Sequence, residues 1–421
     1  MNQNNVKTLV ERNITKTIGC TDIGVVGFIA SIGAYVLRHK KIKTIHLLMS
    51  DELYKNSVNV GVPGIKKSGL NQALALGVLL KNPKSQLSVF ESVTHDDIHQ
   101  IESLLKDIEV KIEHKKFENT VLYEELNMTS TEGDHVKIVI KDYYDHVVSV
   151  IKNGEKLLEF EKDALINRMS PYKISSFDEI CDFVDSNDFN ELDDLFRVAE
   201  IQYQSAREEL KKEGKSCLAE NYIHKENSCA YELSSFLKEH IEISSKKRMI
   251  GDIFTVYGVA GSGNLGIGTF ITPLFMRDAM DLSESLSKRL VVLSFLTSVY
   301  VKQEMNVVTV LCGTGHATGC SSAVSFAYAK HASREQLKKS INLYLSSSMG
   351  FVCDGAKLSC TYKVSFAAMN GLISAQMVLD QGVSCDGLGI QKMDVDQTIR
   401  NLGKLNNEIL ESANKGIISL I

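Results

Sequence analysis

Residues 351–363, Phe-Val-Cys-Asp-Gly-Ala-Lys-Leu-Ser-Cys-Thr-Tyr-Lys, constrain the fold of this chain more than any other stretch. They carry Cys353 and Cys360, which are separated by six residues that begin with an Asp-Gly turn. A third cysteine, Cys312, lies upstream in Leu-Cys-Gly-Thr-Gly, between an apolar run and a stretch of small residues. Thiolates are the ligands that Zn²⁺ and iron–sulfur clusters select. The sequence therefore predicts a fold that brings these segments to one centre.

Two kinds of metal centre are compatible with three thiols. A structural zinc site would need a fourth Cys or His at short spacing, often in paired C-x-x-C knuckles, and no such pair is present. His316 and Cys320 lie close to Cys312 in sequence and stay open as further ligands. A [4Fe–4S] cluster held by three thiolates keeps one iron open, and that iron is a Lewis acid. By spacing alone, three structural thiols remain the alternative.

Cys20 is the fourth cysteine of interest, in Gly-Cys-Thr-Asp at 19–22. The apolar residues 23–37 predict a helix that Thr21 or Asp22 can cap. Backbone amides and the helix dipole stabilise a thiolate at a helix N-terminus, so we expect the pKa of Cys20 to be lowered. A buried cysteine in a tight turn is the alternative.

Further candidates could hold a substrate. Lys55 and Asn56 stand between apolar neighbours, and an apolar segment that we expect to be extended follows them. The pair could contact a carboxylate, although a lone lysine on a surface strand is the plainer interpretation. Gly-Ser-Gly-Asn-Leu-Gly at 261–266 matches a dinucleotide-binding loop, but no βαβ alternation follows it. Its amides, with Ser262 and Asn264, could instead bind a substrate carboxylate.

Lys357 raises the question of pyridoxal phosphate, because it stands among small residues that would suit a Schiff-base lysine. That cofactor also needs a phosphate site, and nothing nearby resembles one. The interpretation is therefore weak.

Composition excludes several classes of protein. The formal net charge of −5 over 421 residues argues against a nucleic-acid-binding surface. The N-terminus is polar and no apolar stretch reaches the roughly 20 residues of a membrane span, so we expect a soluble, cytoplasmic protein without a membrane partner. Nine cysteines are too sparse for a disulfide scaffold, which leaves thiols, metal ligands and catalytic groups. A homo-oligomer is compatible with the sequence.

Hydrophobic periodicity predicts an α+β fold, with a mostly helical catalytic core and a smaller antiparallel β-sheet region inserted in the N-terminal half. Residues 5–17 predict a helix and residues 41–49 a strand. From about 108 to 160, short alternating segments are separated by turns such as Asn153-Gly154, the pattern of antiparallel hairpins. From residue 250 onward, Gly, Ala, Ser and Thr predominate, which suits tightly packed helices.

These shifts in pattern predict three regions. Residues 1–90 are the N-terminal part of the catalytic core with Cys20, residues 91–170 an α/β insertion with antiparallel strands, and residues 171–421 a helical, cluster-binding catalytic region.

The motifs together resemble the L-cysteine desulfidases, a family related to the alpha region of iron–sulfur L-serine dehydratases. The resemblance runs in one order over nearly the whole chain, and the segments with cysteines are its specific part. The matching segments are Gly19-Cys20-Thr21-Asp22, Tyr54-Lys55-Asn56 with Val62-Pro63-Gly64, Gly261-Ser262-Gly263-Asn264, Cys312-Gly313-Thr314-Gly315, and Cys353-Asp354-Gly355-Ala356-Lys357 with Cys360.

The resemblance implies a lyase that needs no pyridoxal phosphate and eliminates sulfide from L-cysteine, giving pyruvate and ammonia. It implies a [4Fe–4S] cluster held by Cys312, Cys353 and Cys360, with Cys20 as proton acceptor. Lys55, Asn56, Ser262 and Asn264 are then candidates for holding the small amino acid.

Two departures from the family pattern bear on activity or substrate preference: Thr21-Asp22-Ile23 stands where Thr-Glu-Pro is usual, and His316 stands where the family tends to carry a small residue. L-serine dehydration by the same mechanism is an alternative. A non-catalytic iron–sulfur redox sensor is another, although it leaves the loops around Cys20 and Asn264 without a purpose.

Overall fold

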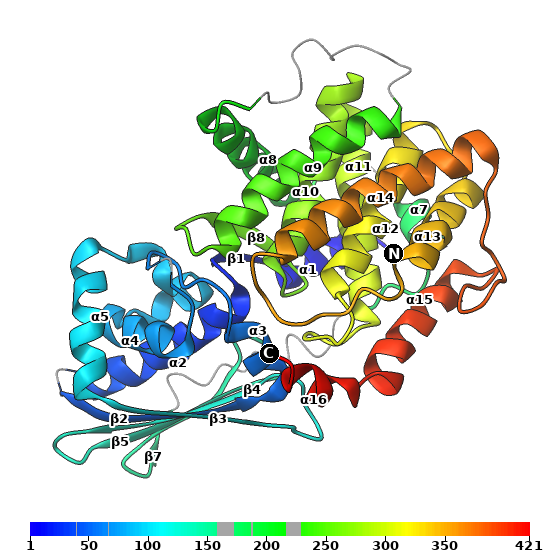
Figure 1. The fold of residues 1–421 in the computed structure, drawn as a ribbon. Helices are drawn as coiled ribbons and strands as arrows, with labels where there is room; N and C mark the ends of the chain where they lie inside the picture. Colours follow the sequence, from blue (N-terminus) through cyan, green and yellow to red (C-terminus); the bar gives the residue numbers. More distant parts are fainter. Residues whose placement is uncertain (39, 66, 158–171, 187, 216–228) are drawn as a thin grey trace.

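The computed structural model describes residues 1–38, 40–65, 67–157, 172–186, 188–215 and 229–421. A sheet with helices on one face lies beside a larger bundle of helices (Figure 1). This arrangement confirms the expected α+β fold with a mostly helical core.

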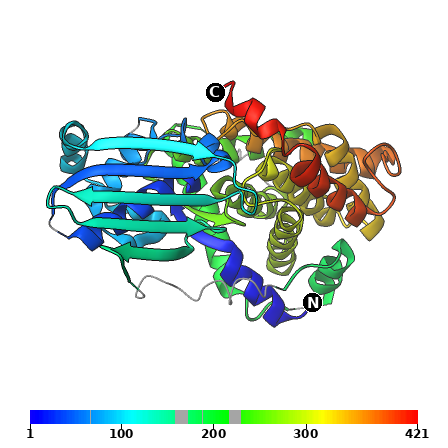
Figure 2. The same ribbon diagram turned by 90° about the horizontal axis from the view of Figure 1, so that it is seen from below.

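The main sheet has six strands in the order β3-β2-β4-β5-β6-β7. Buried and partly exposed residues alternate along β4, so one face of the sheet is covered and the other is not; Figure 2 shows the uncovered face. The turn from β6 to β7 confirms the expected Asn153-Gly154 hairpin, since both residues have positive φ. The strands are β2 (Ile42–Ser50), β3 (Glu109–Lys115), β4 (Tyr123–Ser130), β5 (His135–Lys141), β6 (Val147–Lys152) and β7 (Glu155–Lys156).

One pair of strands differs from the expected antiparallel pattern. Strand β2 pairs antiparallel with β4 on one side but parallel with β3 on the other. The chain leaves β2 through a series of helices and returns to start β3 at the same end, and such a crossover gives a parallel pair. The sheet is therefore mixed, and the strand expected at 41–49 lies inside it.

Helix α2 (Thr21–Leu37) fills the covered face of the sheet. Sixteen of its seventeen residues are buried, so it is apolar all round, as a helix enclosed on every side must be. It packs on the sheet and on the first three of the four elements between β2 and β3, and the fourth of them packs on the second. Those elements are α3 (Asp51–Ser57), α4 (Leu70–Leu80), η1 (Pro83–Ser92) and α5 (His95–Asp107).

Two local expectations were wrong. Lys55 lies in α3 rather than on a surface strand, because Asp51 and Glu52 in the first turn of α3 and Lys55 in its last complement the helix dipole. The helix expected at 5–17 ends at Asn13, where Ile-Thr-Lys-Thr-Ile continues as strand β1 (Ile14–Ile18). Alternation of β-branched residues favours a strand there.

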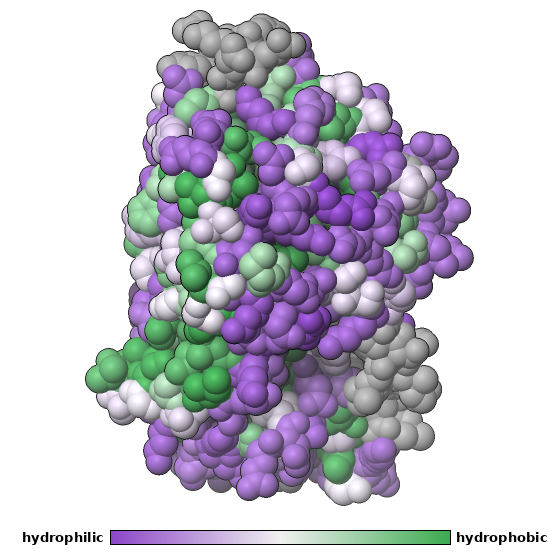
Figure 3. All heavy atoms as spheres, turned by 90° about the vertical axis from the view of Figure 1, so that its right-hand side faces the viewer, coloured by the Kyte–Doolittle hydropathy of each residue, from purple (hydrophilic) through white to green (hydrophobic). Residues whose placement is uncertain are grey.

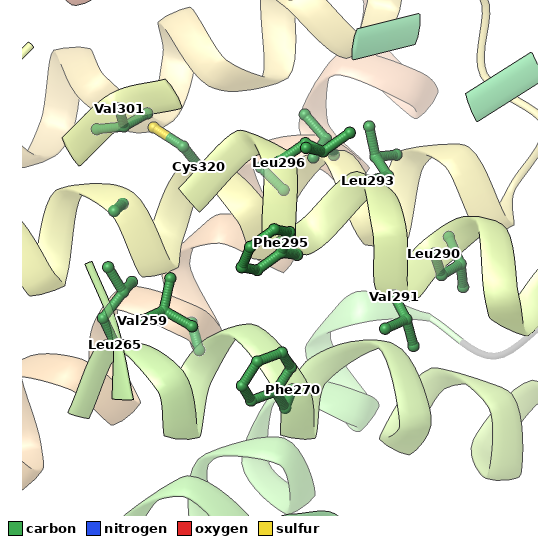
Figure 4. Packing of buried hydrophobic residues seen from close by; sticks show 14 of the residues in the cluster. Val259, Leu265, Phe270, Leu290, Val291, Leu293, Phe295, Leu296, Val301 and Cys320 are labelled. Carbon is green, nitrogen blue, oxygen red and sulfur yellow. The ribbon is translucent and has the colours of Figure 1, made fainter. Parts of the chain in front are cut away.

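The second part of the molecule is a bundle around α12 (Gly313–Ala329). This helix is buried along almost its whole length and packs against four neighbours, which its Gly, Ala, Ser and Thr side chains allow at close range. Apolar side chains of α10 and α11 fill the space beside it (Figure 4). The other helices of this part are α1 (Gln3–Asn13), α7 (Phe177–Ser186), α8 (Asp193–Lys212), α9 (Ala230–Met249), α10 (Gly263–Met280), α11 (Glu284–Gln303), α13 (Arg334–Ser348), α14 (Cys360–Gln381), α15 (Val395–Lys404), the π-helix η3 (Leu405–Ile409) and α16 (Ala413–Ile418).

The chain passes between the two parts early in the sequence. Helix α1 packs into the core of the bundle, and β1 then pairs antiparallel with β8 (Thr255–Val259) before α2 enters the sheet. Residues on both sides of position 90 share one hydrophobic cluster. The boundary expected near 170 falls in 158–171, outside the described residues, so the three-region division stays a prediction.

The outside of the bundle is largely hydrophilic on the face drawn in Figure 3, with apolar residues gathered toward one edge. Among the described residues, no helix has the length and apolar character that crossing a bilayer requires.

Candidate active site

All four cysteines singled out from the sequence line one cavity of about 90 Å³ between the two parts of the molecule. A space this small suits a small molecule rather than a nucleotide, since pockets for larger ligands measure roughly 300–1,000 Å³. The described residues that line the cavity are Cys20, Thr21, Asp22, Asn56, Tyr144, Arg248, Met249, Gly261, Ser262, Asn264, Lys302, Val307, Val308, Thr309, Cys312, Gly313, Thr314, Cys353, Gly355, Ala356, Cys360 and Val364.

Four helices begin at this cavity. Cys20, Ser262 and Cys312 are the N-cap residues of α2, α10 and α12, and Cys360 is the first residue of α14. Backbone N–H groups at helix N-termini lack intrahelical partners and carry partial positive charge. Their convergence gives this wall of the cavity partial positive charge, which favours an anionic ligand such as a carboxylate.

The segments that carry Cys312 and Cys353 are tied together by backbone pairing. Leu311 and Val352 form an antiparallel bridge, the Cys353 amide donates to Val310 O (2.7 Å), and the Cys312 amide donates to Phe351 O (2.6 Å). This short pairing sets the two cysteines on neighbouring strands of backbone.

The Asp-Gly turn after Cys353 is shaped by close packing. Gly355 has φ +93°, and a Cβ there would lie 2.2 Å from Lys55 O, so only glycine fits against α3. Asp354 forms ion pairs with Lys357 and with Lys363 (2.6 Å), which fasten the turn to the start of α14. Burial acts to raise the pKa of Asp354, but these two lysines outweigh it and lower the pKa to about 2.

The three candidate ligand thiols interact electrostatically. Burial, followed by the charges of Cys353 and Cys360, raises the pKa of Cys312 to about 12. Burial and Cys353 also raise the pKa of Cys360. Ionisation of Cys312 and of Cys360 is therefore opposed by burial and by the neighbouring thiols, and bound positive charge would favour their thiolate forms.

The three thiols form an all-sulfur donor set around one cavity. Within the described residues, no three Cys, His, Asp or Glu side chains are close enough to hold one metal ion. Three thiols nevertheless lie around one cavity. The donor set, three cysteine sulfurs, is the one that iron–sulfur clusters take.

Lys302, at the end of α11, adds a cation on the thiol side of the cavity. Its ammonium group donates to Asn306 O (3.0 Å) and Val307 O (3.4 Å). Burial lowers the pKa of Lys302 to about 8, against the opposing effect of Cys312 and Cys353.

Cys20 is held by Asp22, and its environment differs from the one expected. Its thiol donates to Asp22 Oδ2 (3.3 Å), while Tyr144 OH (2.9 Å) and Asn56 Nδ2 (3.3 Å) donate to Oδ1. Burial, followed by the charge of Asp22, raises the pKa of Cys20 well above its ordinary value. The expectation of a lowered pKa was therefore wrong, because loss of hydration outweighs the helix N-terminus.

Of the four residues expected to hold a substrate, Asn56, Ser262 and Asn264 line the cavity and Lys55 does not. Asn56 lines the cavity between Asp22 and Cys353, whose Sγ lies 3.9 Å from Asn56 Oδ1. Ser262 caps α10 and bonds Thr314 Oγ1 (2.8 Å), and Asn264 Oδ1 accepts from Arg248 (3.2 Å). Both line the cavity.

Lys55 lies behind the cavity rather than on its wall. Its side chain is fully buried, and its ammonium group donates to Thr309 O (3.0 Å) and Asn414 Oδ1 (2.8 Å). It thus ties α3 to the loop before Cys312 and to α16.

Two further candidate ligands lie away from the cavity. His316 is buried, and its ring nitrogens lie against Cys312 O (2.8 Å) and Ser348 O (2.9 Å). Cys320 packs among apolar side chains of the bundle (Figure 4). Lys357 does not line the cavity and pairs with Asp354, so the pyridoxal phosphate interpretation gains no support.

Arg248, Tyr144 and Lys302 were missed from the sequence. Arg248 ends a Lys-Lys-Arg run that looks like a solvated face, yet it follows buried Ile241 and Ser245 by seven and three positions. Helical periodicity could therefore have placed it on the buried face. Tyr144 and Lys302 gave no such signal.

A larger cavity of about 490 Å³ adjoins this one and shares Thr21, Tyr144, Gly261, Lys302 and Val307 with it. Its described lining residues include no cysteine, so the chemistry suggested by the thiols belongs to the smaller cavity.

Known proteins match this chain over nearly its whole length. A UPF0597 protein of Fervidobacterium nodosum is 28% identical over 405 residues, which is 94% of this chain and 92% of that protein. UPF0597 proteins of Caldanaerobacter subterraneus and Porphyromonas gingivalis are 26% and 25% identical over 98% and 100% of this chain, and 97% and 98% of their own lengths.

The family model described as the serine dehydratase alpha chain matches residues 84–419, a span that includes Cys312, Cys353 and Cys360. Because this match takes in most of the molecule and three of the four thiols at the cavity, the chain belongs to the serine dehydratase alpha chain family.

Proposed function

We propose that this protein is a lyase that eliminates the β-substituent of a small amino acid, with L-cysteine as substrate and sulfide, pyruvate and ammonia as products. The observation that carries the proposal is the convergence of Cys20, Cys312, Cys353 and Cys360 on one small cavity. Membership in the serine dehydratase alpha chain family supports the class of reaction.

Cys312, Cys353 and Cys360 would hold a [4Fe–4S] cluster. When bound, such a cluster supplies a Lewis acid that polarises the bond between Cβ and its heteroatom. Lys302 lies on the same side and offsets the negative charge of the thiolates. Asp354, Lys357 and Lys363 keep the ligand loop in place.

Cys20 and Asp22 would act together as the base. The Cys20 thiol already donates to Asp22 Oδ2, so the proton passes to Asp22 as Cys20 takes the α-proton of the substrate. Tyr144 and Asn56 hold Asp22 in place from its other oxygen. Sulfide leaves Cβ, and the aminoacrylate tautomerises to an imine that water hydrolyses to pyruvate and ammonia.

Ser262, Asn264 and Asn56 would orient the amino acid. Asn264 Oδ1 is engaged by Arg248, so its amide N–H groups are what it offers a ligand. Lys55 would not touch the substrate. Its hydrogen bond to Thr309 O would keep α3 and the loop around Thr309 in fixed positions.

L-serine is the second candidate substrate, because the family model is described by serine dehydratase. The reaction differs only in its leaving group, hydroxide in place of sulfide. Sulfide release from L-cysteine and pyruvate release from L-serine, compared by kcat/KM on one anaerobic preparation, separate the two.

The test of the proposal is anaerobic purification with iron and sulfide assays beside turnover. Cys20→Ala should keep its iron and lose turnover, whereas Cys353→Ser should lose both iron and turnover. Cys385→Ala removes a free thiol away from the cavity and should change neither. An iron-free wild type that still eliminates sulfide would refute the cluster, and an active Cys20→Ala would refute the base.

A non-catalytic redox sensor would bind iron in the same assays but release neither sulfide nor pyruvate. Its chemistry requires no hydrogen bond between Cys20 and Asp22, so the sensor leaves this buried pair unexplained.

A further inference from the structure

Arg248 is a buried cation in the wall of the cavity that no part of the proposed reaction uses. It stands in the last turn of α9 with only 3% of its surface exposed. Its two terminal nitrogens donate to Asn264 Oδ1 (3.2 Å) and Thr21 Oγ1 (3.2 Å), and its Nε is buried without a hydrogen-bond partner. A guanidinium group therefore bridges the starts of α2 and α10 through two neutral oxygens.

The charge of Arg248 is not balanced by a carboxylate. No ion pair found in the described part of the chain includes Arg248. Asp22 lines the same cavity, but its oxygens receive Cys20, Tyr144 and Asn56. Burying a cation without an anionic partner costs several kcal/mol, so an anion that enters the cavity gains from meeting it.

The two buried cations of the cavity act on different groups. Lys302 interacts electrostatically first with Cys312 and Cys353 and then with Asp22, whereas Arg248 interacts with Cys20 itself. Lys302 therefore mainly complements Cys312 and Cys353, and Arg248 complements negative charge beside Cys20.

We propose that Arg248 binds the α-carboxylate of the amino-acid substrate. This inference rests on the proposed function. It names the residue that holds the carboxylate next to the α-carbon from which the proton is removed. A guanidinium group presents its donors in a planar fork that matches a carboxylate. Anchoring the carboxylate beside Cys20 places the α-carbon, one bond away, within reach of the base.

The test is binding of L-alanine and of ethylamine to the anaerobic holoenzyme, measured by isothermal titration calorimetry. The two differ only in the carboxylate, and neither carries a leaving group. We expect wild type to prefer L-alanine and Arg248→Met to lose that preference, with L-alanine binding on the order of 30-fold weaker. Arg277→Met is the control, because Arg277 is a partly buried arginine paired with Glu200 and Asp278 away from the cavity.

Arg248→Lys guards against a variant that fails to fold, because it keeps the charge and loses the fork. It should bind L-alanine more weakly than wild type and ethylamine equally well. A preference for L-alanine that persists in Arg248→Met, or that wild type lacks, overturns the proposal. A wild type with an Arg248-dependent preference that releases neither sulfide nor pyruvate would refute the proposed function and leave Arg248 as a carboxylate site.

Discussion

The hydrogen bond between Cys20 and Asp22 decides how a buried thiol can act as a base. Burial holds the thiol neutral, since the pKa of Cys20 is raised chiefly by loss of hydration. A thiolate is then formed most easily by transfer to a carboxylate already in contact with it, and Asp22 Oδ2 lies 3.3 Å from Sγ. The pair, rather than Cys20 alone, is the unit that would carry the proton.

Asp22→Asn distinguishes the pair from an isolated thiolate. If Asp22 receives the proton, this variant should lose about 10²-fold or more in kcat/KM at pH 7 and regain activity only at higher pH. If the thiolate acted alone, removal of the Asp22 charge would lower the pKa of Cys20 and shift the acidic limb of the profile to lower pH.

The measurement is kcat/KM against pH for wild type and Asp22→Asn. Asp51→Asn removes a carboxylate that pairs with His114 and does not line the cavity, so it should keep the wild-type profile. An Asp22→Asn enzyme more active than wild type below pH 7 would contradict the paired base.

At this scale the sequence identified the thiols but not their surroundings. Cysteines are rare enough that Cys312, Cys353 and Cys360 could be singled out by spacing, and the capping pattern singled out Cys20. The direction in which the pKa of Cys20 shifts depends on how deeply the thiol is buried. Whether the Nε of Arg248 finds a hydrogen-bond partner depends on which groups pack around it. Both are set by tertiary structure.

Among the elements, strand β4 carries two adjacent glutamates in opposite environments. Glu124 faces α2 and is fully buried with both oxygens unpartnered, and burial raises its pKa well above 4.5. Glu125 faces the other way and pairs with Lys137 (3.0 Å). Burial opposes ionisation of Glu125, but Lys137 and Tyr123 outweigh it and lower its pKa.

Opposite pH dependence of stability follows from these shifts. Glu124 binds its proton more tightly in the folded state, so it costs stability increasingly as pH rises above 4.5. Glu124→Met should therefore raise the free energy of unfolding by about 1–3 kcal/mol at pH 7 and by less near pH 4.5. Urea unfolding at both pH values measures the difference.

Glu125→Gln is the matched control on the neighbouring residue. The lowered pKa means that Glu125 contributes stability above its ordinary pKa of 4.5, and that this contribution is lost as pH falls. Glu125→Gln should thus destabilise almost as much at pH 4.5 as at pH 7, and its effect should fade only below pH 4.5. Equal pH trends in the two variants would contradict the assigned environments.

Most elements could be predicted because their periodicity is local. Strand β5 and the Asn153-Gly154 turn followed directly from alternation and turn chemistry. The parallel pairing of β2 with β3 could not, since it depends on how the crossover helices pack. Helix α3 is seven residues long, too short for a periodic pattern to show.

At the scale of the whole molecule, Lys55 connects segments far apart in the chain. Its ammonium group joins α3 to Thr309 and to Asn414 of α16. No sequence pattern links these positions, so a surface lysine was the plainer interpretation. In the structure, Lys55 is instead buried behind the cavity, where its ammonium group donates two hydrogen bonds.

Asn414→Ala tests how far this contact supports the fold. Lys55 would lose one of its two acceptors while fully buried, which should lower the free energy of unfolding by about 1.5–3 kcal/mol. Lys415→Ala, at an exposed neighbour, should change it by less than about 0.5 kcal/mol. Thermal or urea unfolding measures both, and equal stability of the two variants would show that the contact is dispensable.

The four helices that begin at the cavity start at Cys20, Ser262, Cys312 and Cys360, and this order has a consequence for biosynthesis. At translation rates of 5–20 residues per second, roughly 20–70 s separate the emergence of Cys20 from that of Cys360. Any cofactor that Cys312, Cys353 and Cys360 hold together can enter only after the last of them has left the ribosome. Loading of such a cofactor would then be a late event, and Cys20 leaves the ribosome well before the bundle residues that bury it.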